Sequence, residues 1–248
     1  MNKSSLEKIK ELKNIISNSN NIVFFGGAGV STESGIPDFR SENGIYKAIE
    51  NYGDLPETIL SHSYFITNPN GFYKYYKENM IHSSVKPNYA HLAIAKLEKQ
   101  EKIKAVITQN IDGLHQKAGS KNVLELHGSI MRNSCISCGN NYDLDFIINS
   151  KEIPICNNCR GIVKPDVVLY QEPLDNNIMA KATEYIANSD VLIIGGTSLV
   201  VYPAAGLIQN FNGENLILIN KSETSYDDYA NLVINEAIGE VFKEVMEL

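Results

Sequence analysis

The chain of 248 residues has no tryptophan, few cysteines and no long apolar run. A membrane-spanning helix needs about 20 consecutive apolar residues, so the sequence predicts none. No apolar segment follows the charged start of the chain, which argues against a secretion signal. The net charge is −7 and Lys and Arg form no block, whereas nucleic-acid binding needs a concentrated basic face. We therefore expect a cytoplasmic protein that binds neither nucleic acid nor a membrane.

The four cysteines form two Cys-x-x-Cys pairs, Cys135 with Cys138 and Cys156 with Cys159. In a reducing compartment this spacing predicts a zinc site, and a disulfide or redox role remains the alternative. Four thiolates complete the tetrahedral set that structural zinc prefers. Because no coordination position is left for water or substrate, we expect this metal to hold the fold and to take no part in chemistry.

A glycine-rich loop follows the apolar run at 22–25, which is too short for a buried helix and predicts a parallel strand. Small residues in such a loop let backbone N–H groups approach a phosphate, and hydroxyl groups can add donors. The loop residues expected to bind a dinucleotide are Gly27, Ala28, Gly29, Ser31 and Thr32.

The same loop departs from the fingerprint of an ordinary Rossmann dehydrogenase. That fingerprint places a third small residue where this chain has Thr32, and an acid about 20 residues later that follows a strand. Glu50 stands near that position, but no strand pattern leads into it. The loop continues instead into Asp38, Phe39 and Arg40, a combination that indicates chemistry on the bound molecule.

Other apolar segments also end in polar residues. The runs at 104–108, 123–126, 191–194 and 216–219 predict buried strands that alternate with helical patterns. This alternation indicates a doubly wound parallel sheet of the Rossmann-like α/β class, with ligand groups at the carboxyl ends of the strands. The candidate ligand residues at those ends are Gln109, Asn110, Asp112, His127, Gly196, Thr197, Ser198, Asn220 and Lys221.

Two segments interrupt this pattern, and we expect them to form a smaller domain. They are a helical insertion at 42–86 and the zinc module at 130–162, so that 1–41, 87–129 and 163–248 form the dinucleotide-binding domain. We expect a loop at 43–46 beside the dinucleotide, in which Tyr46 either contacts the cofactor or packs beneath the loop. The extended run at 164–170 either receives a peptide as an added strand or is a blunted edge strand.

Six motifs in this order resemble those of the sirtuins, the NAD-dependent protein deacylases, and they span nearly the whole chain. They are Gly27-Ala28-Gly29-Val30-Ser31 with Ser34-Gly35-Ile36-Pro37-Asp38-Phe39-Arg40, Thr108-Gln109-Asn110-Ile111-Asp112-Gly113-Leu114-His115, Leu126-His127-Gly128, the two cysteine pairs, Gly196-Thr197-Ser198, and Ile219-Asn220. The resemblance implies transfer of the acetyl group from acetyl-lysine to ADP-ribose, with release of nicotinamide and O-acetyl-ADP-ribose. It also implies NAD as co-substrate, structural zinc, and acetylated proteins or peptides as partners. We expect a monomer.

Two other functions remain open beside the deacetylase. A mono-ADP-ribosyltransferase or NAD hydrolase would use the same cleft, with an amino acid or water as the nucleophile. A catalytically silent NAD sensor or scaffold is disfavoured because His127 and Asn110 are both present.

The resemblance also implies roles for individual residues. His127 is expected to be the general base, Asn110 to orient ribose or water, and Asp112 with Ile111 to hold the nicotinamide carboxamide. Phe39 is expected to shield the reaction, while Arg40 and Gln109 contact phosphate and ribose. The remaining expected NAD contacts are Gly27, Ala28, Gly29, Ser31, Thr32, Asp38, Tyr46, Gly196, Thr197, Ser198, Asn220, Lys221 and Ile238, and the peptide contacts are Val168, Gln171, Glu172 and Pro173.

The chain departs from the family at the peptide and acyl sites. Sirtuins usually have glycine at the position of Gln171, and Pro173 has no N–H for strand pairing. Members that accept succinyl or malonyl groups carry Tyr-x-x-Arg, whereas here Tyr73 is followed by Tyr76. Since no arginine is present there to pair a carboxylate, we expect neutral acyl groups, acetyl first.

Overall fold

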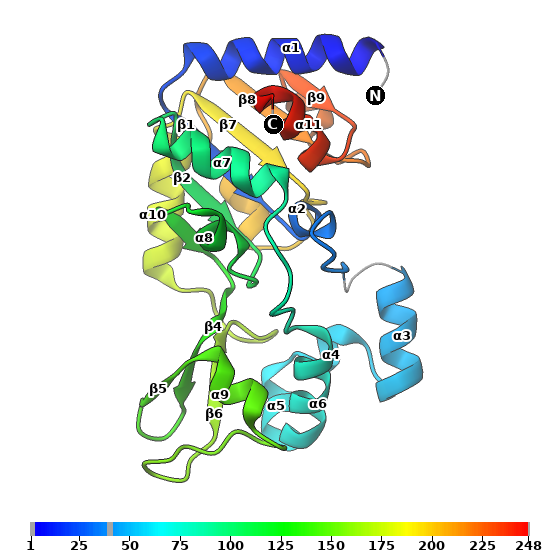
Figure 1. The fold of residues 1–248 in the computed structure, drawn as a ribbon, viewed down its shortest axis with the longest axis vertical. Helices are drawn as coiled ribbons and strands as arrows, with labels where there is room; N and C mark the ends of the chain where they lie inside the picture. Colours follow the sequence, from blue (N-terminus) through cyan, green and yellow to red (C-terminus); the bar gives the residue numbers. More distant parts are fainter. Residues whose placement is uncertain (1–2, 39–41, 248) are drawn as a thin grey trace.

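The computed structural model describes residues 3–38 and 42–247, and a six-stranded parallel sheet forms its larger part (Figure 1). Every pair of neighbouring strands in this sheet runs parallel, so the expected doubly wound α/β class is confirmed. In spatial order the strands are β3 (Val123–Glu125), β2 (Ile103–Thr108), β1 (Ile22–Gly26), β7 (Val191–Gly195), β8 (Asn215–Ile219) and β9 (Leu232–Ile234).

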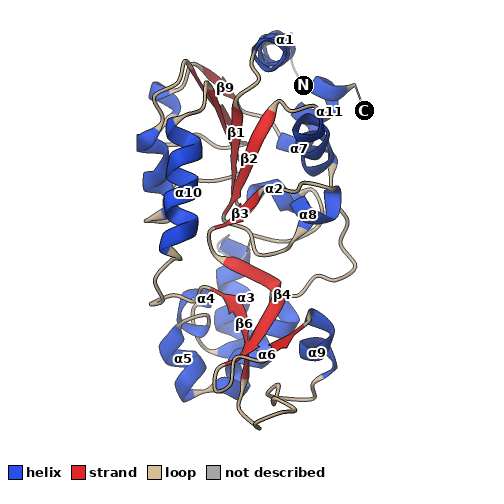
Figure 2. Ribbon diagram, turned by 90° about the vertical axis from the view of Figure 1, so that its left-hand side faces the viewer, coloured by secondary structure: helices blue, strands red, loops and turns tan. Residues whose placement is uncertain are grey.

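Helices cover both faces of this sheet, because successive side chains of a strand point to opposite faces. Phe24 of β1 belongs to the core beneath α1 (Lys3–Asn18), α7 (Tyr89–Lys99) and α11 (Ile238–Met246). Phe25, the next residue, belongs to the core beneath α10 (Asn176–Ala187) and the 3₁₀ helix η1 (Ala204–Asn210). Figure 2 shows α10 on one side of the strands and α7 with α11 on the other.

A second group of elements has its own core and lies at the carboxyl edge of the sheet (Figures 1 and 2). Its antiparallel sheet has the order β5-β4-β6. The strands are β4 (Gly128–Cys135), β5 (Asn141–Tyr142) and β6 (Val163–Val167), and the helices are α3 (Glu42–Tyr52), α4 (Pro56–Ile59), α5 (His62–Thr67), α6 (Pro69–Asn79) and α9 (Leu144–Asn149). Because β6 pairs with β4, the small group extends beyond the boundary expected at residue 162.

One local expectation is wrong. The segment at 43–46 is part of helix α3 and not a loop, and Tyr46 is 68% exposed on that helix instead of packing beneath a loop. Within the helical insertion, α4 and α5 are separate helices, because Ser61 caps the start of α5 by accepting from the Tyr64 N–H. The described chain also contains the short elements α2 (Gly29–Thr32), α8 (Leu114–Ala118) and η2 (Asp227–Tyr229).

Two buried histidines, His91 on α7 and His115 on α8, contact each other on the face of the sheet that α7 covers. Their ring centroids are 4.8 Å apart, and His115 also packs on Phe24. His91 Nε2 and both ring nitrogens of His115 have no hydrogen-bond partner in the described chain. Burial lowers the pKa of His91 to about 4, and burial followed by the neighbouring His91 lowers the pKa of His115.

We expect the His91→Gln protein to lose less stability in acid than the wild type. The pKa of His91 is about 4 in the folded protein and 6.5, its ordinary value, in the unfolded chain. The resulting stability is therefore fully present above pH 6.5 and is lost as the pH falls towards about 4. For His91 alone the loss between pH 7 and pH 5 is about 2 kcal/mol. Glutamine can keep the capping box that His91 forms with Asn88, but it does not titrate. Guanidinium unfolding of both proteins at the two pH values measures the difference, and equal acid sensitivity would contradict this account.

Candidate active site

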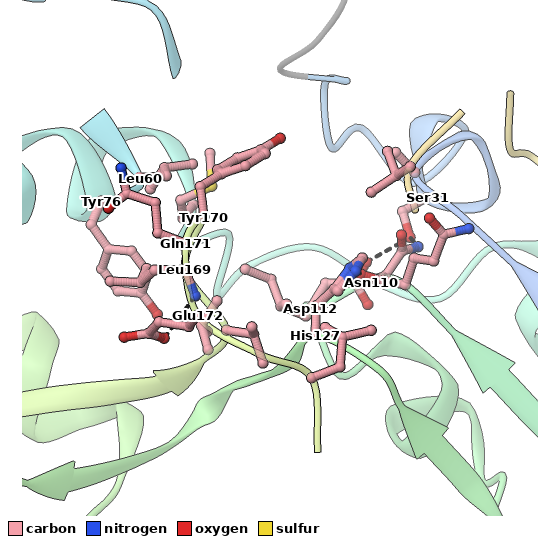
Figure 3. A pocket seen from close by; sticks show the side chains of 18 of the residues that line it. Ser31, Leu60, Tyr76, Asn110, Asp112, His127, Leu169, Tyr170, Gln171 and Glu172 are labelled. Atoms are coloured by element: carbon pink, nitrogen blue, oxygen red, sulfur yellow. Dashed lines mark hydrogen bonds between the residues drawn. The ribbon is translucent and has the colours of Figure 1, made fainter. Parts of the chain in front are cut away.

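A cavity of about 640 Å³ opens where the carboxyl ends of β1 and β2 meet the small group. Figure 3 shows Ser31, Asn110, Asp112 and His127 on one side of it, and Leu60, Tyr76 and residues 169–172 on the other. The expected site residues that line this cavity are Ala28, Ser31, Gln109, Asn110, Ile111, Asp112, His127, Val168, Gln171, Glu172 and Pro173.

The glycine loop is built for close packing against the loop after β7. The Gly27 N–H donates to the Gly195 carbonyl at 3.2 Å, and the Gly29 N–H donates to the Gly196 carbonyl at 2.7 Å. A Cβ atom on Gly29 would lie 2.7 Å from the Gly196 Cα, a distance that side chains do not tolerate. These two N–H groups are therefore occupied within the protein, contrary to the expectation that the loop offers them to a phosphate.

Ser31 connects the glycine loop to the polar residues after β2. Its hydroxyl donates to Asp112 Oδ2 at 2.7 Å and accepts from Asn110 Nδ2 at 3.1 Å. Asn110 Nδ2 also donates to the Gly27 carbonyl at 3.0 Å. This network fixes the orientation of the Asn110 amide and the Asp112 carboxyl at the cavity wall.

Burial raises the pKa of Asp112, while the Leu114 N–H and the Ser31 hydroxyl act in the opposite direction. The Leu114 N–H lies 2.8 Å from Asp112 Oδ1, so each carboxyl oxygen accepts one hydrogen bond. The carboxyl is consequently held in one geometry, which suits recognition of a planar amide such as a carboxamide.

His127 has a defined tautomer. Its Nδ1 lies 2.8 Å from the Gln109 carbonyl oxygen, which can only accept, so Nδ1 carries the proton. In the neutral ring Nε2 is therefore the basic nitrogen. The sheet ends place this imidazole beside Asn110 and Asp112 on the same side of the cavity (Figure 3). A neutral imidazole held in this way is suited to general-base catalysis near pH 7.

The loops after β7 and β8 are joined by hydrogen bonds to the side of the cavity that carries His127. Thr197 accepts from Gln109 Nε2 through its hydroxyl at 3.1 Å, and its N–H donates to Asn220 Oδ1 at 2.9 Å. Asn220 Nδ2 returns a hydrogen bond to the Thr197 carbonyl at 3.0 Å. The expected cofactor residues that do not line the cavity are Gly27, Gly29, Thr32, Asp38, Tyr46, Gly196, Thr197, Ser198, Asn220, Lys221 and Ile238, while Phe39 and Arg40 lie outside the described residues.

The segment after β6 is paired along one edge. The Tyr170 N–H donates to the Leu60 carbonyl at 3.0 Å, and the His62 N–H donates to the Tyr170 carbonyl at 2.9 Å. Nearer the sheet, the Val168 N–H donates to the His127 carbonyl at 2.9 Å. A peptide strand could therefore pair only with the opposite edge of this segment.

Glu172 stabilises the segment from within. Its carboxylate accepts from the Leu169 N–H at 2.9 Å, forms an ion pair with Lys164 at 3.1 Å and is hydrogen-bonded to His62 Nδ1 at 3.0 Å. Burial opposes ionisation of this carboxyl, but these three partners outweigh it and lower its pKa. The Glu172 side chain thus holds the shape of the proposed peptide site.

The cavity has an apolar end away from His127. Figure 3 shows Leu60, Tyr76 and Leu169 there, and Tyr76 is fully buried with its hydroxyl unpartnered among the described residues. Met80 and Val167 also line the cavity. Tyr76 is the residue that the comparison with Tyr-x-x-Arg places at the acyl site. The others carry no sequence signal of their own, because apolar residues in helices and strands are equally typical of a core.

The four cysteines converge as expected, with all Sγ atoms within 4.8 Å of one another. The Sγ atoms of Cys135 and Cys159 are 3.4 Å apart, and those of Cys138 and Cys156 are 3.7 Å apart. Tetrahedral zinc with Zn–S bonds of about 2.3 Å requires S–S distances of about 3.8 Å. The tetrad is therefore positioned to bind structural zinc, and none of its members lines the cavity.

A parallel sheet with polar groups at its carboxyl edge, facing a small domain with a zinc tetrad, defines a sirtuin-like NAD-dependent enzyme. The Sir2 family model matches residues 27–203. Relatives named NAD-dependent protein deacetylase are 60% identical over 97% of this chain in Clostridium perfringens and 59% in Clostridium acetobutylicum, and each match covers 99% of the relative. The chain belongs to the Sir2 family.

Solved structures agree with this assignment. A Sir2 structure described with a deacetylated p53 peptide and 3'-O-acetyl ADP-ribose has a TM-score of 0.87 and 39% identity, and the match covers 96% of this chain and 97% of the other. A Sir2 structure described with a p53 peptide and NAD+ has a TM-score of 0.85 and 38% identity, with 96% and 97% covered. In the described part of the chain, no helix has the length and apolar character needed to cross a bilayer.

Proposed function

We propose that this protein is an NAD-dependent protein lysine deacetylase in which His127 is the general base. The single observation that supports this most directly is the convergence of His127, Asn110 and Asp112 on one side of a cavity large enough for a ligand. The names of the relatives agree with the reaction. Incubation with an acetyl-lysine peptide, with and without NAD, tests the proposal, and deacetylation that does not need NAD would refute it.

NAD supplies an ADP-ribose acceptor for the acetyl group once nicotinamide has left. Asp112, with both oxygens fixed by Ser31 and Leu114, would hold the nicotinamide carboxamide together with Ile111. His127 Nε2 would accept a proton from a ribose hydroxyl, because Nδ1 is already protonated against the Gln109 carbonyl. Asn110 would orient ribose or a water.

Gln109, Thr197 and Asn220 would support the remainder of NAD, since they are joined by hydrogen bonds next to the cavity wall. Val168, Gln171, Glu172 and Pro173 line the cavity and would form the peptide side. Transfer of ADP-ribose to an amino acid, or hydrolysis of NAD, would use the same groups and is the competing function.

We propose acetyl as the preferred acyl group and expect succinyl peptides to be poor substrates. The cavity lining contains no Lys or Arg among the described residues, and its far end is apolar around Tyr76. Burying an unpaired carboxylate costs several kcal/mol, so kcat/KM for a succinyl peptide should be at least about a hundredfold below that for acetyl.

A butyryl peptide is the matched control, because butyryl has the same chain length as succinyl without the carboxylate. We expect butyryl to be accepted better than succinyl. Equal kcat/KM values for the butyryl and succinyl peptides would show that a cation pairs the carboxylate and would refute the proposed selectivity.

We further propose a cytoplasmic monomer that does not bind nucleic acid. The net charge of −7 supports the last point, because an acidic chain without a basic block repels a phosphate backbone. Light scattering measures the mass in solution, and a dimer would contradict the monomer.

A further inference from the structure

Gln171 has a backbone conformation that is unfavourable for a residue with a side chain. Its φ is +76°, in the left-handed region that glycine adopts readily and that costs other residues about 1 kcal/mol or more. The residue lies in the segment that lines the cavity on the proposed peptide side. Some contact must therefore hold this conformation in place.

The contact is with Ser63, in the first turn of α5. The Ser63 N–H donates to Gln171 Oε1 at 3.0 Å, and the Ser63 hydroxyl donates to the same oxygen at 2.6 Å. Because a backbone N–H can only donate, the atom that faces it must be the amide oxygen and not the amide nitrogen.

This contact also completes the capping of α5. The first N–H groups of a helix have no partner within the helix. Here the His62 N–H donates to the Tyr170 carbonyl, the Ser63 N–H to Gln171 Oε1, and the Tyr64 N–H to the Ser61 hydroxyl. The helix start and the segment at 169–172 thus fix each other.

The left-handed residue stands where an extended substrate would pair. The Gln171 N–H donates to no described residue, while the neighbouring Tyr170 is tied to Leu60 and His62 on the edge away from it. Strand pairing with a peptide depends on the direction of such backbone groups. Because Tyr170 is anchored, a change of φ at Gln171 would turn the Gln171 carbonyl and residues 172–173 away from their present direction relative to the Gln171 N–H.

We propose that Gln171 is a positioning residue for peptide binding, acting through Ser63. The side-chain contact holds residues 169–173 in the shape that receives an acetyl-lysine peptide, and so performs the task that glycine performs by its own conformational freedom. This inference rests on the proposed function, since it concerns the peptide side of that same site.

Replacement by alanine and by glycine separates the two roles of the side chain. Gln171→Ala loses the contact with Ser63 but keeps the cost of the left-handed conformation, so KM for the peptide should rise about tenfold. Gln171→Gly loses the same contact without that cost, so KM should stay within about twofold of the wild type. Ser63→Ala removes one of the two hydrogen bonds, and we expect a rise of about threefold. In all three variants kcat and the KM for NAD should stay within about twofold of the wild type.

Gln100→Ala is the matched control, because Gln100 is an exposed glutamine that ends α7 outside the cavity lining. An unchanged peptide KM in Gln171→Ala would overturn the proposal. A glycine variant as impaired as the alanine variant would also overturn it, since the side chain would then contact the peptide directly.

Amide hydrogen exchange provides a readout that does not depend on turnover. The amides of His62 and Tyr170 should exchange faster in Gln171→Ala than in the wild type, and at nearly the wild-type rate in Gln171→Gly. Equal exchange in the alanine variant and the wild type would refute the positioning role. A wild-type protein that does not deacetylate the peptide would instead refute the proposed function, so the two failures are distinguishable.

Discussion

Replacement of His127 by alanine should lower kcat for deacetylation by a factor of about a hundred to ten thousand, the contribution typical of a general base. The imidazole lies at the cavity wall on the same side as Asn110 and Asp112, and the Gln109 carbonyl sets its tautomer so that Nε2 is the basic nitrogen. The backbone carbonyl of His127, which accepts from the Val168 N–H, remains in the variant. We therefore expect the loss to be chemical and not structural. Steady-state assays of deacetylated peptide measure it.

His127→Gln is the more conservative comparison, because its amide can still donate to the Gln109 carbonyl but cannot act as a base. Both variants should bind NAD, contain zinc and unfold at nearly the wild-type denaturant concentration. Activity within tenfold of the wild type in either folded variant would show that another group removes the proton.

Cys135→Ala should abolish zinc binding and most of the soluble protein. The binding free energy of structural zinc is about 10–16 kcal/mol in isolated zinc modules, which is comparable with the whole stability of a domain, about 5–15 kcal/mol. Cys135 is buried in the core of the small group and belongs to the end of β4. Without it, three thiolates cannot complete the tetrahedral site, and β4 loses its anchor to the second cysteine pair. Zinc content and soluble yield are the measurements.

Ser137→Ala is the control, because Ser137 is exposed in the turn between Cys135 and Cys138 and contributes no zinc ligand. It should retain zinc and yield. A Cys135→Ala protein that is folded, free of zinc and active would contradict the structural role of the metal.

The positions of the main site residues could be predicted because they depend on a simple topological rule. Parallel strands bring their carboxyl ends to one edge, so residues that follow β1, β2 and β3 must lie near one another. Ser31, Asn110 and His127 are far apart in sequence but line one cavity for this reason. The zinc tetrad was equally predictable, since its spacing carries the chemistry directly.

Other features could not be predicted, because they depend on tertiary packing. Gly27 and Gly29 suggested a phosphate cradle, but their N–H groups are bonded to the loop after β7, which no local pattern reveals. Tyr46 lies on helix α3 and not in the loop expected at 43–46. Propensity is weak evidence where neighbouring elements supply the stabilising contacts.

The conformation of Gln171 also depends on tertiary packing that the sequence does not reveal. The sequence identified it as a departure from glycine, which put the peptide pairing in question. Only the structure shows that Ser63 holds the left-handed conformation that glycine would otherwise provide. The cost of a non-glycine residue at position 171 is thus offset by Ser63, which lies more than 100 positions away in the sequence.

The products of one reaction test the central claim most directly. The wild-type protein is incubated with NAD and an acetyl-lysine peptide, and nicotinamide, O-acetyl-ADP-ribose and free-lysine peptide are quantified together. We expect the three products in equal amounts, and O-acetyl-ADP-ribose should form at least about a hundredfold more slowly with the His127→Ala protein. Nicotinamide formed without deacetylated peptide would contradict the deacetylase and would support ADP-ribosyl transfer or NAD hydrolysis in the same cleft.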